Sequence, residues 1–282
     1  MKGLLAFFAK RYIAGEERKD AIRVVRHLNS QGILATIDNL GEHVKEPSHA
    51  EDAVREYLSL LDDIRDGGVN SSVSLKLTHF GLDISDEIAE GNLRGIIKKA
   101  SELNNFVTFD MEGSRYTQRT IDTFLRLHEK YTNIGIAIQS YLYRSPMDVR
   151  LLIEKGASVR LVKGAYKEPT QIAFPKKRDV DKNFEELMKS LLLKGNYPAI
   201  ATHDERLINE AIRFADENGI PKERFEFQML LGIKRKLQKR LADSGYKVRV
   251  YIPYGADWLP YTLRRLRERK ENLFFVIKNL FE

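Results

Sequence analysis

The chain has 282 residues, 43% of them hydrophobic, which is enough for one large α/β domain with a full-sized core. It contains no cysteine, which excludes disulfides, thiolate metal sites and a thiol nucleophile. The 47 basic and 40 acidic side chains give a net charge of +7, which favours an acidic substrate, nucleic acid or an anionic lipid surface as partner.

The first residues of the chain, MKGLLAFFAKRY, contain an apolar stretch that Lys10 and Arg11 cut short. No apolar run approaches the length of about 20 residues that a membrane-spanning helix needs. We therefore expect neither a signal peptide nor a membrane span. The absence of cysteine fits the reducing environment of the cytoplasm, where we expect the protein to reside.

The first 32 residues predict helices, because residues 21–32, AIRVVRHLNSQG, have helical periodicity and end at a typical stop, Gly32. From residue 33 onward, eight short β-branched or apolar runs recur at intervals that leave room for a helix between each pair. These runs are residues 33–40, 73–78, 106–112, 135–142, 159–165, 198–204, 224–230 and 248–255.

Helical patterns such as AVREYLSLLDDIRD and FEELMKSLLLK separate the runs. Eight βα units without a linker between them match a (β/α)8 barrel better than a six-stranded doubly wound sheet. The sequence has no G-x-G-x-x-G motif that would indicate a dinucleotide-binding fold. We predict an α/β chain in which residues 33–282, including the last helix, form a TIM-like barrel. Residues 1–32 would form a helical extension that caps its bottom.

Each predicted strand carries polar side chains at its end, where barrel active sites are assembled. These residues are Asp38, Glu42, Lys76, Asp110, Glu112, Gln139, Arg160, Lys163, His203, Gln228, Tyr251 and Tyr254. For any one of them, a solvated strand end is the ordinary alternative. Lys76, Gln139, Arg160 and Gln228, however, stand within apolar runs and need partners if they are buried.

The last predicted helix, residues 257–269, has the sequence DWLPYTLRRLRER, in which the leucines follow one helical stripe. A second stripe holds Tyr261, Arg264, Arg265 and Glu268. Two guanidinium groups side by side suit a carboxylate or a phosphate, whereas a solvated charged face is the general alternative. Because this helix follows the eighth strand, we expect it to overhang the mouth of the barrel.

The motifs RLVKGAYKEP, FEFQMLLG, ATHDE, VSLKLT, TFDMEG and YIPYGADWLPYTLRRLRER resemble those of the proline dehydrogenases, FAD-dependent enzymes that oxidise L-proline. The resemblance covers essentially the whole chain in family order and is to the short monofunctional form. The absence of cysteine agrees, since the fused aldehyde dehydrogenase of the bifunctional form needs a thiol nucleophile.

The resemblance implies nine FAD-binding residues. They are Met111, Gln139, Arg160, Val162, Lys163, Gly164, Ala165, Thr202 and His203. Arg160 would lie near the reactive N5 of the flavin, Gln139 would bond the ring, and Gly164 would let the backbone approach closely. Thr202 and His203 would contact the ribityl and phosphate groups. Without the resemblance, polar strand ends would be the ordinary interpretation.

The resemblance also implies a substrate site. Its residues are Lys76, Leu230, Tyr251, Tyr261, Arg264 and Arg265. The three cations would hold the proline carboxylate, while the tyrosines and the leucine would enclose the ring. Asp110 and Arg160 are the expected catalytic residues, with Asp110 orienting Lys76 or shifting its pKa. Glu42 is expected to pair with Arg264, and Glu268 to orient one arginine.

In this family, hydride passes from L-proline to flavin N5, gives 1-pyrroline-5-carboxylate, and starts proline degradation to glutamate. The resemblance implies a membrane quinone as electron acceptor and a separate 1-pyrroline-5-carboxylate dehydrogenase as the next enzyme. The basic segment 233–240, IKRKLQKR, is expected to be an outer barrel helix. The alternative is that it docks on anionic lipid, which would place the protein at the inner face of the membrane.

Two rival functions follow from the residues. Asp110, Glu112 and His203 could surround a divalent ion in a barrel hydrolase. A nucleic-acid binder would use the net positive charge, but the sequence lacks an interleaved basic and aromatic patch, so we expect no nucleic-acid partner. The oligomeric state stays open.

Overall fold

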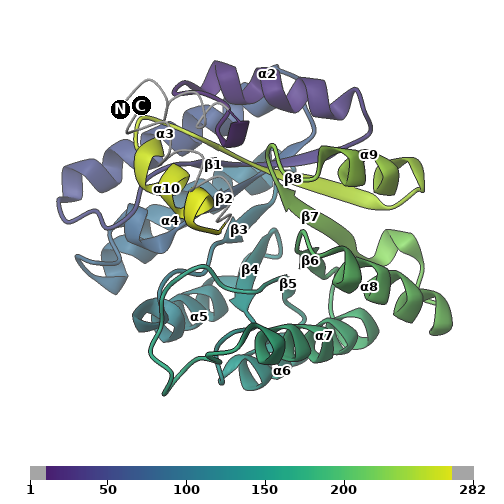
Figure 1. Cartoon of the computed structure of the whole chain (residues 1–282). Helices are drawn as coiled ribbons and strands as arrows, with labels where there is room; N and C mark the ends of the chain where they lie inside the picture. The colour runs from purple at the N-terminus through teal and green to yellow at the C-terminus, as the bar shows by residue number, and fades with distance from the viewer. Residues whose placement is uncertain (1–10, 269–282) are drawn as a thin grey trace, which may run out of the picture.

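The computed structural model describes residues 11–268 and, in the last helix, side chains as far as residue 263. Eight parallel strands close into a barrel in chain order (Figure 1). They are β1 (Leu34–Asn39), β2 (Ser71–Leu75), β3 (Val107–Phe109), β4 (Ile134–Gln139), β5 (Ser158–Val162), β6 (Ala199–Ala201), β7 (Glu226–Leu230) and β8 (Lys247–Tyr254). Each strand overlaps the run that predicted it, so the (β/α)8 fold is confirmed.

Helices separate the strands. They are α2 (Arg18–Asn29), α3 (Pro47–Asp66), α4 (Asp86–Glu102), α5 (Ser114–His128), α6 (Ser145–Glu154), α7 (Lys177–Lys194), α8 (Glu205–Glu217), α9 (Arg235–Asp243) and α10 (Trp258–Glu268), with 3-10 turns η1 (Leu77–Phe80) and η2 (Lys222–Arg224). Among residues 11–268, no helix is long and apolar enough to cross a membrane.

The position of α2 differs from the prediction that the N-terminal extension caps the bottom of the barrel. This helix packs beside β1, β8 and α3, and its Ala21 and Val25 are buried in the main core. The reason lies at the other end of the chain, where α10 follows β8 but lies away from it, on the side of β1 and β2 in the view of Figure 1. α2 therefore fills the place in the outer ring next to β8.

Alternation along the strands decides what lies inside the barrel. In β2, Val73 and Leu75 are fully buried in the apolar layer that includes Phe124 of α5. Burying a side chain of this kind contributes about 1.5–3 kcal/mol. The intervening Ser74 instead points into the barrel, and its hydroxyl bonds to the hydroxyl of Thr36 on the neighbouring strand β1, at 3.1 Å.

The interior of this barrel is polar, although barrels of this fold are ordinarily filled with branched apolar side chains. Three carboxylates and three cations lie within it and bond to one another. They are Asp38, Asp110, Glu226, Lys76, Arg160 and Arg249. Because the two signs match in number, these side chains add no net formal charge to the core.

Candidate active site

A cavity of about 640 Å³, the active-site cavity, opens at the carboxyl ends of the strands, where this fold places active sites. Its walls come from strands β2 to β8 and the loops after them. Tyr261 of α10 also lines it, so α10 lies at the mouth of the barrel as the sequence predicted (Figure 1).

Every predicted catalytic, cofactor or substrate residue whose side chain the structure describes lines this cavity. These residues are Lys76, Asp110, Met111, Gln139, Arg160, Val162, Lys163, Gly164, Ala165, Thr202, His203, Leu230, Tyr251 and Tyr261. They come from seven different strands or strand ends and from α10, and the closed barrel brings them together. Their individual roles remain predictions.

Lys76 lies at the centre of a buried polar cluster. Its Nζ is 2.8 Å from Oδ2 of Asp38 and 3.7 Å from Oδ2 of Asp110. The hydroxyl of Tyr251 is 3.4 Å from the same Nζ and donates to Asp110 at 2.6 Å. Burial disfavours the ammonium, but Asp38 and Asp110 outweigh it and raise the pKa of Lys76. The lysine is therefore a fixed cation at neutral pH.

The same surroundings keep Tyr251 protonated. Burial, reinforced by Asp110, raises the pKa of Tyr251 well above its ordinary value. The phenol is thus a hydrogen-bond donor throughout the physiological pH range.

Arg160 explains why β5 carries a cation in an apolar run. The side chain is only 5% exposed, and its two terminal nitrogens donate to Asp110 at 2.5 Å and to Ser74 at 2.7 Å. Its guanidinium also lies 5.7 Å from the ring centre of Tyr251. Arg160 is therefore held in one position in the wall of the cavity, with its charge balanced by Asp110.

Gln139 ends β4 in the same wall. Its Nε2 donates to the carbonyl of Met111 at 3.3 Å. Its Oε1 is buried and accepts no hydrogen bond from the described part of the chain. An unsatisfied buried acceptor costs about 1–3 kcal/mol, so this atom calls for a donor from a molecule in the cavity.

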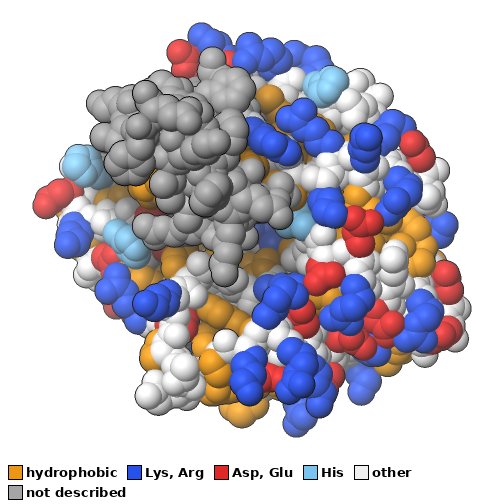
Figure 2. Space-filling view, in the orientation of Figure 1, with side chains coloured by type: hydrophobic (Ala, Val, Ile, Leu, Met, Phe, Trp, Pro, Cys, Tyr) orange, Lys and Arg blue, Asp and Glu red, His pale blue; other side chains and the backbone are white. Residues whose placement is uncertain are grey.

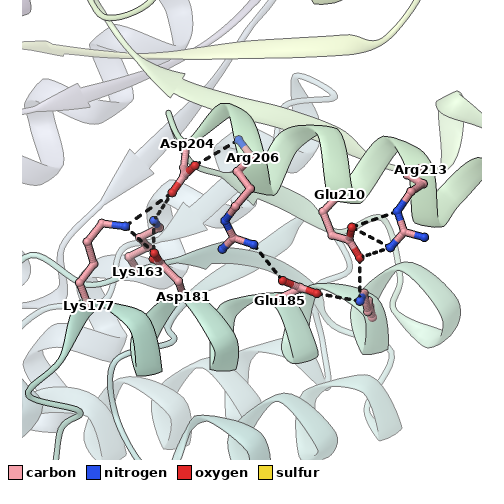
Figure 3. A network of polar contacts seen from close by, with 9 residues as sticks. Lys163, Lys177, Asp181, Glu185, Asp204, Arg206, Glu210 and Arg213 are labelled. Atoms are coloured by element: carbon pink, nitrogen blue, oxygen red, sulfur yellow. Dashed lines mark hydrogen bonds and ion pairs between the residues drawn. The ribbon is translucent and has the colours of Figure 1, made fainter.

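Lys163, the second cation of the β5 motif, is part of a surface network (Figure 3). Its Nζ lies 2.6 Å from Asp181 of α7 and 3.0 Å from Asp204. Asp204 also accepts from the backbone N–H of Arg206 and so caps α8. The network joins the loop after β5 to α7 and α8 and fixes Lys163 at the edge of the cavity.

Gly164 has a φ of +113°, which strains any residue with a side chain. A Cβ built at this position would lie 2.5 Å from the ring of Tyr141. The sequence interpretation was that glycine clears room for a cofactor. In the structure, the backbone angle and the Tyr141 ring already require glycine.

Thr202 and His203 follow β6. Nε2 of His203 accepts the backbone N–H of Leu230 at 2.9 Å, so the neutral ring carries its proton on Nδ1. The hydroxyl of Thr202 accepts the N–H of Asp204 at 3.1 Å. Both side chains therefore shape the loops at the mouth as well as lining the cavity.

Tyr261 connects the cavity with the N-terminal segment, because it is buried with Tyr12, Leu40 and Ile233 while Leu230 packs against this cluster. The other predicted residues of α10 are Arg264, Arg265 and Glu268. Their side chains lie outside the described residues, as does the expected pair between Arg264 and Glu42.

Comparison with known proteins decides the family, because residues 21–278 match the model for proline dehydrogenase. The chain belongs to the proline dehydrogenase family. Proline dehydrogenase 1 of Bacillus subtilis (strain 168) is 42% identical over 274 residues, covering 97% of this chain and 91% of that protein. Proline dehydrogenase of Deinococcus radiodurans is 40% identical over 279 residues, covering 97% and 90%. The predicted likeness to the monofunctional form is confirmed, and the chain is an oxidoreductase.

Solved structures of proline utilization proteins have the same fold as this chain. Proline utilization A (PutA) from Bdellovibrio bacteriovorus, inactivated by N-propargylglycine, superposes on 95% of this chain with a TM-score of 0.88 and 30% identity. This chain spans only 33% of that larger protein. A mutant PutA from Bradyrhizobium japonicum, at 21% identity and a TM-score of 0.79, shares the fold.

The proline dehydrogenase motifs did not reveal every residue of the site. Asp38, the closest partner of Lys76, was recognised only as a polar strand end, because 38 residues separate the two in sequence. Gln228 was noted within an apolar run but given no role. Tyr166 and Lys177 line the cavity without any sequence signal that singled them out.

The rival metal site is not assembled. The two carboxylate oxygens of Asp110 accept hydrogen bonds from Arg160 and Tyr251. The carboxylate of Glu112 accepts hydrogen bonds from both the N–H and the hydroxyl of Thr78. Among the described residues, the group with metal-ligand spacing is Glu42, His43 and Glu112, which does not line the active-site cavity. The geometry thus favours the proline dehydrogenase interpretation over the metal hydrolase.

The basic segment 233–240 leads into α9, where Leu237 and Leu241 are buried, as expected for an outer helix. Several of its cations form ion pairs. The side-chain nitrogens of Lys234 and Arg240 lie 2.5 and 3.3 Å from the carboxylate oxygens of Glu205. On the face shown in Figure 2, basic and acidic side chains are interspersed. A charged surface of this kind is typical of a solvated exterior.

Proposed function

We propose that the chain oxidises L-proline to 1-pyrroline-5-carboxylate with FAD and passes the electrons to a quinone, as the first step of proline degradation to glutamate. The names of its relatives support the substrate. The observation that carries the proposal is the buried cation Lys76. It lies in the same cavity as Arg160 and the unsatisfied oxygen of Gln139, so one space offers a carboxylate anchor and a cofactor wall.

The residues that line the cavity fit FAD. Oε1 of Gln139 is a buried acceptor in need of a donor, and a flavin ring carries an N–H group. Lys163, Thr202 and His203 supply a cation, a hydroxyl and an imidazole, which suit ribityl and phosphate oxygens. The stretch from Val162 to Ala165 adds backbone groups along the wall. Met111 contributes its own backbone beside Gln139.

Bound FAD would take up a hydride from the ring carbon beside the proline nitrogen and deliver the electrons to a membrane quinone. The fixed positive charge of Arg160 is suited to stabilising negative charge that develops beside it. Asp110 holds that guanidinium, the phenol of Tyr251 and the region of Lys76 in one arrangement. We therefore assign Asp110 and Arg160 as the catalytic pair.

The substrate end combines charge with shape. Lys76 would bind the proline carboxylate together with Arg264 and Arg265, which the sequence places on α10. Tyr251, Tyr261 and Leu230 would enclose the five-membered ring. Anchoring by the carboxylate fixes the orientation of the ring, which is the main contribution a protein makes to such a transfer.

A quinone acceptor would bring the protein to the inner face of the membrane as a peripheral protein of the cytoplasm. The unstable product would pass to a separate 1-pyrroline-5-carboxylate dehydrogenase.

The test is a visible spectrum of the purified chain, followed by anaerobic addition of proline. We expect a flavin spectrum that bleaches with L-proline and not with D-proline. Arg264→Ala and Arg265→Ala should then weaken the apparent binding of proline more than they reduce flavin content. A protein that stays colourless after incubation with FAD would remove the proposed function.

A further inference from the structure

A second cavity, of about 390 Å³, lies inside the barrel at the amino-terminal ends of the strands; we call it the lower cavity. Polar side chains in its wall include Ser72, Thr108 and the ion pair of Glu226 with Arg249, whose atoms are 2.7 Å apart. Of the 15 residues that line it, Arg160 and Gln228 also line the active-site cavity. The two spaces therefore meet at these two side chains.

Two lining residues indicate that the lower cavity holds water. Nε of Arg160 and Nδ1 of His128 are buried and have no hydrogen-bond partner among the described residues. Buried polar atoms of this kind are normally satisfied by ordered water. One water occupies about 30 Å³ of the liquid, so the cavity has room for several.

The proposed reaction needs a route for a proton. The amine of free proline is protonated at neutral pH, and it must lose that proton before the ring can be oxidised. Each carboxylate near the substrate end is already bound to a cation: Asp38 to Lys76, and Asp110 to Arg160. The remaining oxygens accept from Tyr57 and Tyr251, so neither carboxylate has a free oxygen to receive the substrate proton.

We infer that water in the lower cavity carries this proton to solvent at the amino-terminal end of the barrel. The N–H bond of the substrate ammonium breaks, its electron pair stays on nitrogen, and the proton leaves on water past Arg160 and Gln228. Asp110 offsets the charge of Arg160, and Gln228 donates a 2.5 Å hydrogen bond to Glu226 on the side of the lower cavity. The inference rests on the proposed function, because that reaction supplies the proton.

The decisive variant is Thr108→Leu, since Thr108 lines the lower cavity and not the active-site cavity. The larger side chain should fill the route without touching the substrate. Thr108→Val is the matched control, because valine keeps the shape of threonine and leaves the route open. Gln228→Met, which removes the polar group where the cavities meet, provides a second variant if Thr108→Leu does not fold.

The readout is the anaerobic rate at which L-proline bleaches the flavin, measured from neutral to alkaline pH in H2O and D2O. We expect Thr108→Leu and Gln228→Met to slow bleaching about tenfold or more at neutral pH, with a larger D2O effect. The defect should vanish at alkaline pH, where proline arrives as the neutral amine. Thr108→Val should behave as the parent. A defect that is equal at every pH, or no defect, would overturn the inference.

All variants share the charged groups around the active-site cavity, so a pH profile that differs between them reports on the lower cavity. These groups are Lys76, Asp110, Arg160, Lys163, Lys177 and Asp204. A crystal structure of the parent gives an independent result. Water bonded to Nε of Arg160 is expected, and a dry lower cavity would overturn the inference. If water is present but proline bleaches no flavin, the proposed function fails instead.

Discussion

Tyr251 and Asp110 are joined by a hydrogen bond of 2.6 Å, although 141 residues separate them in the sequence. The other oxygen of the same carboxylate accepts a hydrogen bond from Arg160. Asp110 therefore couples a phenol on β8 to a guanidinium on β5, and both face the active-site cavity. A substitution at Tyr251 or Arg160 is therefore expected to alter the position of Asp110 and, through it, of the other side chain.

Tyr251→Phe should keep the ring that faces the substrate and remove the donor to Asp110. A hydrogen bond to a charged group is worth about 1.5–3 kcal/mol, so kcat/KM for proline should fall roughly 10- to 100-fold. The ratio of flavin to protein should not change, because this hydroxyl bonds Asp110 and Lys76. Steady-state kinetics and the visible spectrum measure both. An unchanged kcat/KM would show that the bond has no part in the reaction.

Lys76→Met should destabilise the fold as well as weaken proline binding. Removing one partner of a buried ion pair costs about 3–5 kcal/mol, because Asp38 would lose its cation and stay buried near the charge of Asp110. Adding Asp38→Asn should recover much of the unfolding free energy in urea and none of the affinity for proline. Recovery of both would mean that Lys76 acts only as a structural residue.

Arg249→Met should destabilise the fold by about 3–5 kcal/mol, because it leaves Glu226 charged and buried in the lower cavity. The matched control is Arg213→Met, which breaks exposed pairs with Glu210 and Glu217 and should cost about 0–1 kcal/mol. Urea unfolding of the two variants gives the comparison. Equal losses would contradict the buried character of the Glu226 pair.

Stability should depend on pH through His79 in η1. Burial, helped by Lys76, lowers the pKa of His79 to about 4. In the unfolded chain the ring binds a proton near its ordinary pKa of about 6.5. Between pH 6.5 and 4 the unfolded state therefore binds a proton that the folded state does not bind. The contribution of His79 to the free energy of unfolding is fully present above pH 6.5, and it decreases by up to about 3 kcal/mol as the pH falls toward 4.

His79→Leu should flatten the pH dependence of the unfolding free energy between pH 6.5 and 4. His27→Asn, a change at an exposed histidine on α2, should leave that dependence as it is. Unfolding in urea at several pH values provides the test. The idea fails if the two variants show the same slope.

Much of the fold and part of the site were predictable from local pattern. Apolar runs with helices between them are a local property, so all eight strands were found. Lys76, Gln139 and Arg160 could be recognised because a charged or amide group inside an apolar run needs a partner in the interior.

The partners themselves were not predictable, because they come from distant parts of the chain. Asp38 reaches Lys76 only once β1 and β2 pair, and the ring of Tyr141 explains Gly164 only in three dimensions. The place of α2 depends on where α10 goes, which no pattern within residues 1–32 reveals.

Closure of the barrel has a consequence for how the chain matures. β1 pairs with β8 from Leu34 to Asn39, and Arg249 bonds the carbonyl of Ala35 across 214 residues. Contacts between such distant segments form slowly, and β8 leaves the ribosome only after the seven strands that precede it. Until then Lys76 and Asp38 have no Tyr251 beside them. The nascent chain therefore carries its future active site as an open, incomplete sheet, and we expect it to depend on chaperones until β8 emerges.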